Sequence, residues 1–227
     1  RKALDARRNR PPHFIYAVKL ILSDQTVLPD KIPDGMQLQT FQDEPSIMPS
    51  PGAFPVKRPV VVVGSGPAGL FAAYMMSLKG FPVILFEQGR SVEQRIKDVE
   101  MFWKKGILNP QSNVLFGEGG AGTFSDGKLT SRSSNPYSSW VKKVLVDMGA
   151  PPAILTDAKP HIGTDRLQIV LLNLRRKLLE MGCLIRFEAQ VTNLIITHDA
   201  VAAVIVNGEE EIRAKTVILA VGQGADD

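Results

Sequence analysis

The stretch PVVVVGSGPAGLFAAYMMSLKGFPVILFE, residues 59–87, decides the fold. Residues 60–63 are four consecutive valines, a run typical of a parallel strand buried on both faces. Residues 83–86, VILF, form a second run of this kind. The segment between them has helical character and ends at a Lys-Gly pair. The stretch therefore predicts a strand, a helix and a second, parallel strand.

The turn after the first strand has the pattern G-x-G-x-x-G, formed by Gly64, Gly66 and Gly69. The first glycine permits a sharp turn, the second lets a pyrophosphate approach the backbone, and the third lets the helix pack closely on the strand. A helix beginning near Pro67 and Ala68 would direct its unpaired amides at that phosphate. The pattern and its context predict a dinucleotide site.

An acidic residue ends the second strand. Glu87 follows Gly64 by 87 − 64 = 23 positions, near the spacing at which a carboxylate reaches the 2′-hydroxyl of an adenosine ribose. A carboxylate there would repel a 2′-phosphate, so we expect an unphosphorylated adenine dinucleotide. Gln88 and Arg90 follow directly and are candidates for contacts on the adenosine side, although a surface role for Arg90 is equally compatible with the sequence.

A second glycine-rich stretch, FGEGGAGTFSDGKLTSR, spans residues 116–132. Its five glycines between residues 117 and 127 supply unhindered amides and positive φ angles, which are the ingredients of an anion-binding nest. The apolar residues in the same stretch favour a packed loop over a free surface loop. The residues that we expect to face a cofactor are Gly119, Gly120, Ala121, Gly122, Thr123 and Lys128.

The order of the remaining elements points to one fold class. Helices are predicted over residues 92–105, 135–148 and 165–181, and β-rich runs over residues 184–187, 191–197, 201–206, 211–213 and 216–221. Asn207-Gly208 is a strong hairpin signal. The sequence predicts an α/β, Rossmann-like domain with a parallel sheet and an inserted antiparallel meander.

The helix predicted over residues 92–105 has signals at both ends. Ser91 and Gln94 have the spacing of a capping box, and Gly106 can end the helix in a left-handed conformation. Val99 and Trp103 belong to its apolar face, so we expect Trp103 in the core rather than stacked on a flavin.

The chain before residue 59 differs in composition. Residues 1–10 are basic and of possible helical character, and residues 14–22 are typical of a strand. Seven prolines between residues 23 and 59 indicate a linker or a covering arm. We therefore expect residues 1–55 to be the end of a small α+β domain with its linker, and residues 56–227 to be a cofactor-binding domain, truncated at its C-terminus.

Composition narrows the function classes. The net charge of +4 comes from well-mixed charges, which argues against a nucleic-acid partner. The single cysteine, Cys183, cannot form an internal disulfide and is predicted to be a small buried apolar residue. There is no apolar run long enough to span a membrane and no signal peptide at the visible start, so we expect no membrane partner and a cytoplasmic location, or an organelle matrix for a processed chain. The oligomeric state does not follow from the sequence.

Three segments resemble one family, the bacterial-type FAD-dependent dehydrogenases with a glutathione-reductase-like FAD domain and two dinucleotide-binding domains. They are VVVVGSGPAGLFAA, LNPQSNVLFGEGGAGTFSDGKLTSR and KPHIGTDRL, of which the second is the most specific. The resemblance implies FAD as cofactor, with the pyrophosphate at Gly66 to Gly69, the backbone near Val191 at the adenine, and the loop from Gly119 to Lys128 toward the flavin. The final strand ends at Gly222-Gln223, where relatives commonly carry a Gly-His pair, so no role of that histidine transfers.

The resulting functional expectation is an FAD-dependent oxidoreductase with a small-molecule substrate or an electron donor such as NAD(P)H. His161, in a turn beside a glycine, is a weak candidate catalytic residue. No pattern of metal ligands and no nucleophile with a partnering base stands out. The alternatives are an NAD-dependent dehydrogenase and a non-catalytic nucleotide-binding or interaction module.

Overall fold

The computed structural model describes residues 1–7, 11–23, 31–39, 58–130, 135 and 137–222. Four strands form a parallel sheet with the order β5-β4-β3-β9. They are β3 (Val60–Val63), β4 (Val83–Phe86), β5 (Leu184–Arg186) and β9 (Thr216–Leu219). The first strand in sequence is central, flanked by β4 and β9, which is the arrangement of a Rossmann-like domain.

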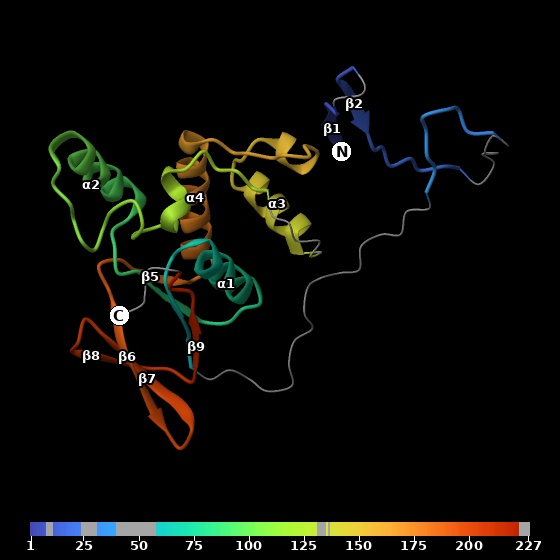
Figure 1. The fold of residues 1–227 in the computed structure, drawn as a ribbon. Helices are drawn as coiled ribbons and strands as arrows, with labels where there is room; N and C mark the ends of the chain where they lie inside the picture. The colour runs from blue at the N-terminus through green and yellow to red at the C-terminus, as the bar shows by residue number, and fades with distance from the viewer. Residues whose placement is uncertain (8–10, 24–30, 40–57, 131–134, 136, 223–227) are drawn as a thin grey trace.

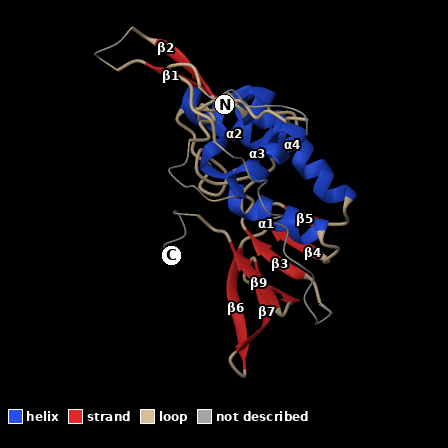
Figure 2. Cartoon of the chain, turned by 90° about the vertical axis from the view of Figure 1, so that its right-hand side faces the viewer, coloured by secondary structure: helices blue, strands red, loops and turns tan. Residues whose placement is uncertain are grey.

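Helices and an antiparallel sheet cover opposite faces of this parallel sheet (Figures 1 and 2). The helical elements are α1 (Pro67–Leu78), α2 (Val92–Lys105), α3 (Tyr137–Asp147), α4 (Thr164–Glu180) and the 3₁₀ helices η1 (Gly120–Phe124) and η2 (Pro152–Leu155). The antiparallel sheet has the order β6-β7-β8, formed by β6 (Val191–Thr197), β7 (Ala200–Val206) and β8 (Glu210–Arg213). The predicted fold class, with its inserted meander, is confirmed.

The four valines of β3 contribute to two separate cores. Val60 and Val62 pack in one cluster with residues of α1, α3 and α4, which also buries Cys183 as predicted. Val61 and Val63 point the other way, into a cluster with Val204 and Val206 of the meander. Because successive side chains of a strand point to opposite faces, an uninterrupted valine run is what a strand covered on both faces requires.

Two glycines permit the closest backbone approaches in the domain. Gly64 has φ +97°, and a Cβ there would lie 2.5 Å from the carbonyl oxygen of Ala220, next to β9. A Cβ on Gly69 would lie 1.8 Å from the carbonyl oxygen of Gly64. Both positions therefore need glycine for packing of the protein itself.

The N-terminal segment departs from the prediction. Residues 2–5 are a strand, β1 (Lys2–Asp5), and not part of a helix, since they pair antiparallel with β2 (His13–Tyr16). Strand β2 is shorter than the strand predicted over residues 14–22, because residues 17–23 form no strand. Lys2 also exchanges backbone hydrogen bonds with Thr156 and Ala158, which attaches the hairpin to the segment after η2. The domain boundary near residue 55 lies outside the described residues and remains a prediction.

Trp103 is also placed differently from the prediction. It is 63% exposed, whereas Val99, one turn earlier, is 1% exposed. The apolar face of α2 packs against the core only along the first turns of the helix. The Trp103 ring contacts the Phe124 ring edge-on, with ring centroids 6.1 Å apart. The expected C-terminal cap is confirmed, because Gly106 has φ +70° and its amide donates to the carbonyl oxygen of Phe102.

The difference between Gly69 and Gly66 gives a stability prediction. Gly69→Ala should lower the free energy of unfolding by roughly 3 kcal/mol, because the added methyl group overlaps the carbonyl oxygen of Gly64. Gly66→Ser is the matched control: Gly66 has φ −66°, nothing would lie closer than 4.0 Å to a Cβ at this position, and serine is a good N-cap residue. Urea unfolding of both variants measures the difference, and equal stabilities would contradict this account of Gly69.

Candidate nucleotide-binding site

The first glycine loop joins β3 to α1 at the carboxyl edge of the parallel sheet, between the ends of β3 and β9. In an open α/β sheet this edge is the usual ligand site, at the point where the strand order reverses. Gly66 is the N-cap of α1, no side chain caps the helix, and its first turn carries no acidic residue. The amides of Ala68 and Gly69 lie in the first turn, where the helix itself provides no carbonyl oxygen to accept from them. This helix end is therefore suited to binding an anion.

Gly66 differs from its two companion glycines. Its φ of −66° is accessible to every residue type, and the nearest atom to a Cβ there would be the Cα of Gly120 at 4.0 Å. Neither backbone conformation nor packing of the described residues requires glycine at this position. Close approach of a ligand to the backbone is a physical reason that remains.

The second glycine loop packs directly against the first. The Gly119 amide donates a hydrogen bond of 2.9 Å to the carbonyl oxygen of Ser65, and a Cβ on Gly120 would lie 3.2 Å from the Cα of Gly66. The loop turns through left-handed conformations at Gly119 (φ +84°) and Gly120 (φ +65°) into η1, which contains Ala121, Gly122 and Thr123. The structure thus brings together the two glycine-rich segments, 64–69 and 119–123, that the sequence singles out.

Glu87 lies beside the first loop and is 5% exposed. Its Oε2 accepts hydrogen bonds from the Ser65 amide (2.8 Å) and the Ser65 hydroxyl (2.7 Å), and its Oε1 accepts one from the Gly89 amide (2.9 Å). The carboxylate therefore ties the end of β4 to the glycine turn. Oε1, with a single hydrogen-bond donor, retains capacity to accept another.

The other predicted residues lie on several elements. Arg90 forms ion pairs of 3.1 Å with Asp98 and Glu188, which supports the surface role left open above. Lys128 pairs with Asp126 at 2.8 Å, an exposed contact that raises the lysine pKa and lowers the aspartate pKa. His161 is exposed and forms an isolated antiparallel bridge with Lys128. Gln88 follows β4, Val191 begins β6 and Gly222 follows β9.

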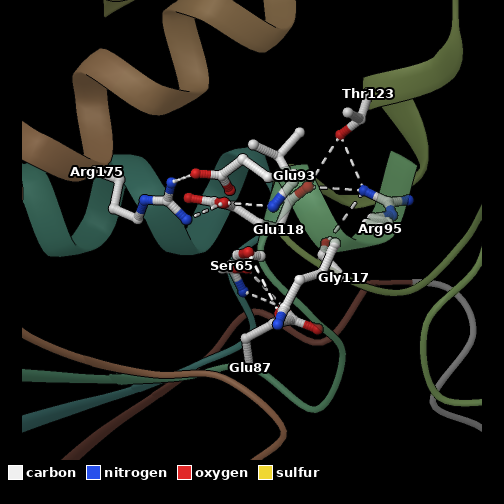
Figure 3. Close-up of polar contacts among 11 residues, drawn as sticks. Ser65, Glu87, Glu93, Arg95, Gly117, Glu118, Thr123 and Arg175 are labelled. Carbon is white, nitrogen blue, oxygen red and sulfur yellow. Dashed lines mark hydrogen bonds and ion pairs between the residues drawn. The ribbon is translucent and has the colours of Figure 1, made fainter. Parts of the chain in front are cut away.

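A buried charge network that the sequence analysis did not identify supports the second loop (Figure 3). Arg95 of α2 is fully buried. Its guanidinium donates to four carbonyl oxygens of the segment before η1, those of Asn113 (2.7 Å), Val114 (2.8 Å), Gly117 (3.3 Å) and Glu118 (2.7 Å), and to the Thr123 hydroxyl (3.0 Å). Burial lowers the arginine pKa to about 10, so Arg95 stays charged at neutral pH.

Glu118 is the acidic member of this network and is 1% exposed. Its Oε2 accepts from the Val92 amide (2.8 Å), the first residue of α2, and from Arg175 Nη1 of α4 (3.0 Å). Desolvation raises the pKa of Glu118 to about 7, against the opposing effects of the Val92 amide and Arg175. Arg175 also pairs with the half-exposed Glu93. The predicted capping box is not formed: the Ser91 hydroxyl does not cap α2, and the Glu118 carboxylate occupies that place.

The site offers a ligand backbone amides and one carboxylate. The two glycine loops pack together at one sheet edge, with the first-turn amides of α1 and the Glu87 carboxylate beside them. Among the described residues there is no group of three or more histidine, cysteine, aspartate or glutamate side chains that could hold a metal ion. No helix in the described part of the chain is both long and apolar enough to cross a membrane.

Comparisons with known proteins agree with the fold. A family model described as an NAD(P)-binding Rossmann-like domain matches residues 62–105. An uncharacterized protein of Clostridium beijerinckii is 35% identical over 228 residues, which cover all of this chain but only 42% of the relative. This chain thus spans less than half the length of that relative.

Solved structures that match this chain have low sequence identity and TM-scores below 0.5. The GidA-related protein of Thermus thermophilus is 18% identical with a TM-score of 0.40, over 73% of this chain and 53% of that one. Glycine oxidase of Bacillus cereus is 12% identical with a TM-score of 0.46, over 72% of this chain and 55% of that one. Ferredoxin reductase of Rhodopseudomonas palustris is 14% identical with a TM-score of 0.33, over 73% and 24%.

The raised pKa of Glu118 predicts a pH-dependent stability difference. A carboxyl whose pKa is higher in the folded than in the unfolded chain contributes stability that is complete below the unfolded value, 4.5, and is lost as the pH rises through about 7. Glu118→Gln removes this titration. Relative to the wild type, the variant should therefore gain about 3 kcal/mol of unfolding free energy between pH 4.5 and pH 8.

Chemical unfolding of both proteins across this pH range measures the gain. A difference that stays constant with pH would show that Glu118 does not titrate in this window. Glu93→Gln is the control, since the Glu93 side chain is 52% exposed and its pKa is shifted downward.

Proposed function

We propose that this chain forms the FAD-binding part of a flavin-dependent oxidoreductase. The observation that carries the proposal is the pair of glycine loops packed at the carboxyl edge of the sheet, with Gly66 open where Gly64 and Gly69 are closed by protein atoms. The resemblance of three segments to FAD-dependent dehydrogenases supports FAD over other dinucleotides. The antiparallel meander between β5 and β9 supports the same choice, because a plain nicotinamide-binding domain usually continues in strand–helix units.

The residues present fit the adenosine diphosphate portion of FAD. The first-turn amides of α1 and the loop 119–123 would hold the pyrophosphate, whose two negative charges suit a helix N-terminus without acidic residues. Glu87 would accept from the adenosine ribose through Oε1, which has one donor in the protein. The backbone near Val191 would contact the adenine, and Gln88 would lie on the same adenosine side.

The part of the second loop that leads to Lys128 would extend toward the flavin. When bound, FAD supplies the acceptor and donor of electrons, and the protein supplies orientation and electrostatics. Lys128 offers a cation, although Asp126 neutralises it in the structure. His161 lies opposite Lys128 in the β-bridge and is exposed, so a substrate could reach it. The substrate class and the electron donor, NAD(P)H among the candidates, belong to the whole protein.

NAD is the second candidate, because the family model matched by residues 62–105 is described as NAD(P)-binding. Glu87 is compatible with either nucleotide, since both carry an adenosine ribose with a free 2′-hydroxyl. A non-catalytic nucleotide-binding module would have the same adenosine site. The purified protein, incubated with excess FAD and desalted, distinguishes these possibilities by its absorbance near about 450 nm. A colourless protein that binds NAD would overturn the proposal.

Gly66 provides the sharper test. Gly66→Val and Gly66→Ser should each abolish FAD retention, because any side chain enters the space where the pyrophosphate approaches the backbone. Gly66→Ser should keep the wild-type unfolding free energy, since serine caps a helix well and no protein atom would lie within 4.0 Å of its Cβ. FAD stoichiometry after desalting, together with urea unfolding, is the measurement. Retention of FAD by a folded Gly66→Ser protein would contradict the placement of the pyrophosphate.

A further inference from the structure

The second glycine loop has little regular structure of its own. Residues 113–119 form bends and a turn, followed by the short 3₁₀ helix η1. Glycines lower the cost of its left-handed turns but increase the entropy lost when the loop is ordered. Side-chain contacts between the loop and the neighbouring helices are therefore needed to hold it against Gly66.

Arg95 and Glu118 provide two different attachments. Arg95, a residue of α2, donates to the loop's own carbonyl groups, which holds the internal shape of the loop and also joins it to α2. The Glu118 carboxylate points away from the loop to α2 and α4, where the Val92 amide and Arg175 hold it. Glu118 is thus the loop residue whose own side chain joins the loop to both α2 and α4.

Glu118 is adjacent to the contact between the two loops. Gly119, the next residue, donates to Ser65, and Gly120 lies against Gly66. A displacement of Glu118 would be transmitted through one peptide unit to the Gly119 amide. With 1% exposure, the Glu118 carboxylate itself is inaccessible to a ligand in solvent.

A buried carboxylate beside an anion-binding loop also needs compensation. Its negative charge would oppose a pyrophosphate, and an unpaired buried carboxylate is costly in itself. The titratable and charged groups that face it are Arg175, Arg95, Glu93 and Glu87. Arg175 is the one cation in direct contact with its side chain among the described residues, and its own side chain is only 16% exposed.

We propose that Glu118 and Arg175 are positioning residues for the dinucleotide: their ion pair fixes the second glycine loop against the first and thereby sets the affinity of the site. The proposal rests on the proposed function for the identity of the ligand, FAD. Since Arg175 lies on α4, a residue of this helix would influence how tightly the pyrophosphate binds.

The test compares four variants at pH 8, where Glu118 is ionised. Arg175→Gln and Glu118→Gln should each weaken FAD binding about tenfold, the effect of losing one buried charged contact. The double variant should bind FAD no more weakly than either single variant, because both changes remove the same pair. Glu93→Gln, which removes the exposed partner of Arg175 and leaves Glu118 in place, should stay within about twofold of the wild type, as expected for an exposed ion pair.

Dissociation constants are measured by fluorescence titration of protein shown to be folded by circular dichroism. A purely structural role would lower the unfolding free energy and leave the FAD dissociation constant of the folded protein unchanged. Equal dissociation constants for wild type, Arg175→Gln and Glu118→Gln would overturn the proposal, as would losses that add up in the double variant.

Amide hydrogen exchange of the cofactor-free protein provides a second readout, which separates this proposal from the choice of FAD. Peptides covering residues 113–124 should exchange about tenfold faster in Arg175→Gln and Glu118→Gln than in wild type or Glu93→Gln, because local opening is governed by the contacts that hold the loop. If the wild type takes up no FAD, the proposed function fails, and faster loop exchange in the two variants still supports the positioning role. Unchanged exchange overturns that role whichever nucleotide binds.

Discussion

The close contact between Gly69 and Gly64 is the constraint on which the rest of the domain depends. Because a Cβ on Gly69 would lie 1.8 Å from the Gly64 carbonyl oxygen, helix α1 can lie this close to the turn only without a side chain there. The approach fixes the angle at which α1 leaves β3. It also directs the N-terminus of α1 to the edge where β3 and β9 end, so a single backbone contact affects both the packing and the location of the candidate ligand site.

Features set by local pattern and by burial on both faces were predictable from the sequence. The valines of β3, the apolar run of β4 and the periodic leucines of α4 each encode their own element. Asn207 and Gly208, with φ of +52° and +79°, form the predicted turn between β7 and β8. The adjacency of the two glycine loops was only an inference from the resemblance, since no local pattern records a contact between segments so far apart in the chain.

The predictions that failed have one physical cause: each of these features depends on a contact with a residue far away in the sequence. Residues 2–5 form a strand because His13–Tyr16 pairs with them, which outweighs weak local helical character. Trp103 is exposed because α2 packs on the hydrophobic core through its earlier turns, and the ring contact of Trp103 is with Phe124, far along the chain. The N-terminus of α2 is capped by Glu118, 26 residues further on, instead of Ser91. One signal was present: Glu118 is the single charged residue in the run FGEGGAGTF, where a surface loop would usually carry more.

The position of Cys183, between the helices and β5, allows its thiol to report local opening of the core. It is 2% exposed, and burial raises the pKa of its thiol to about 11, so the reactive thiolate is scarce in the folded chain. Because Cys183 is the sole cysteine, a thiol-specific dye reacts with the protein only when the packing around this residue opens. The labelling rate then measures how often this part of the core opens, without any engineered label.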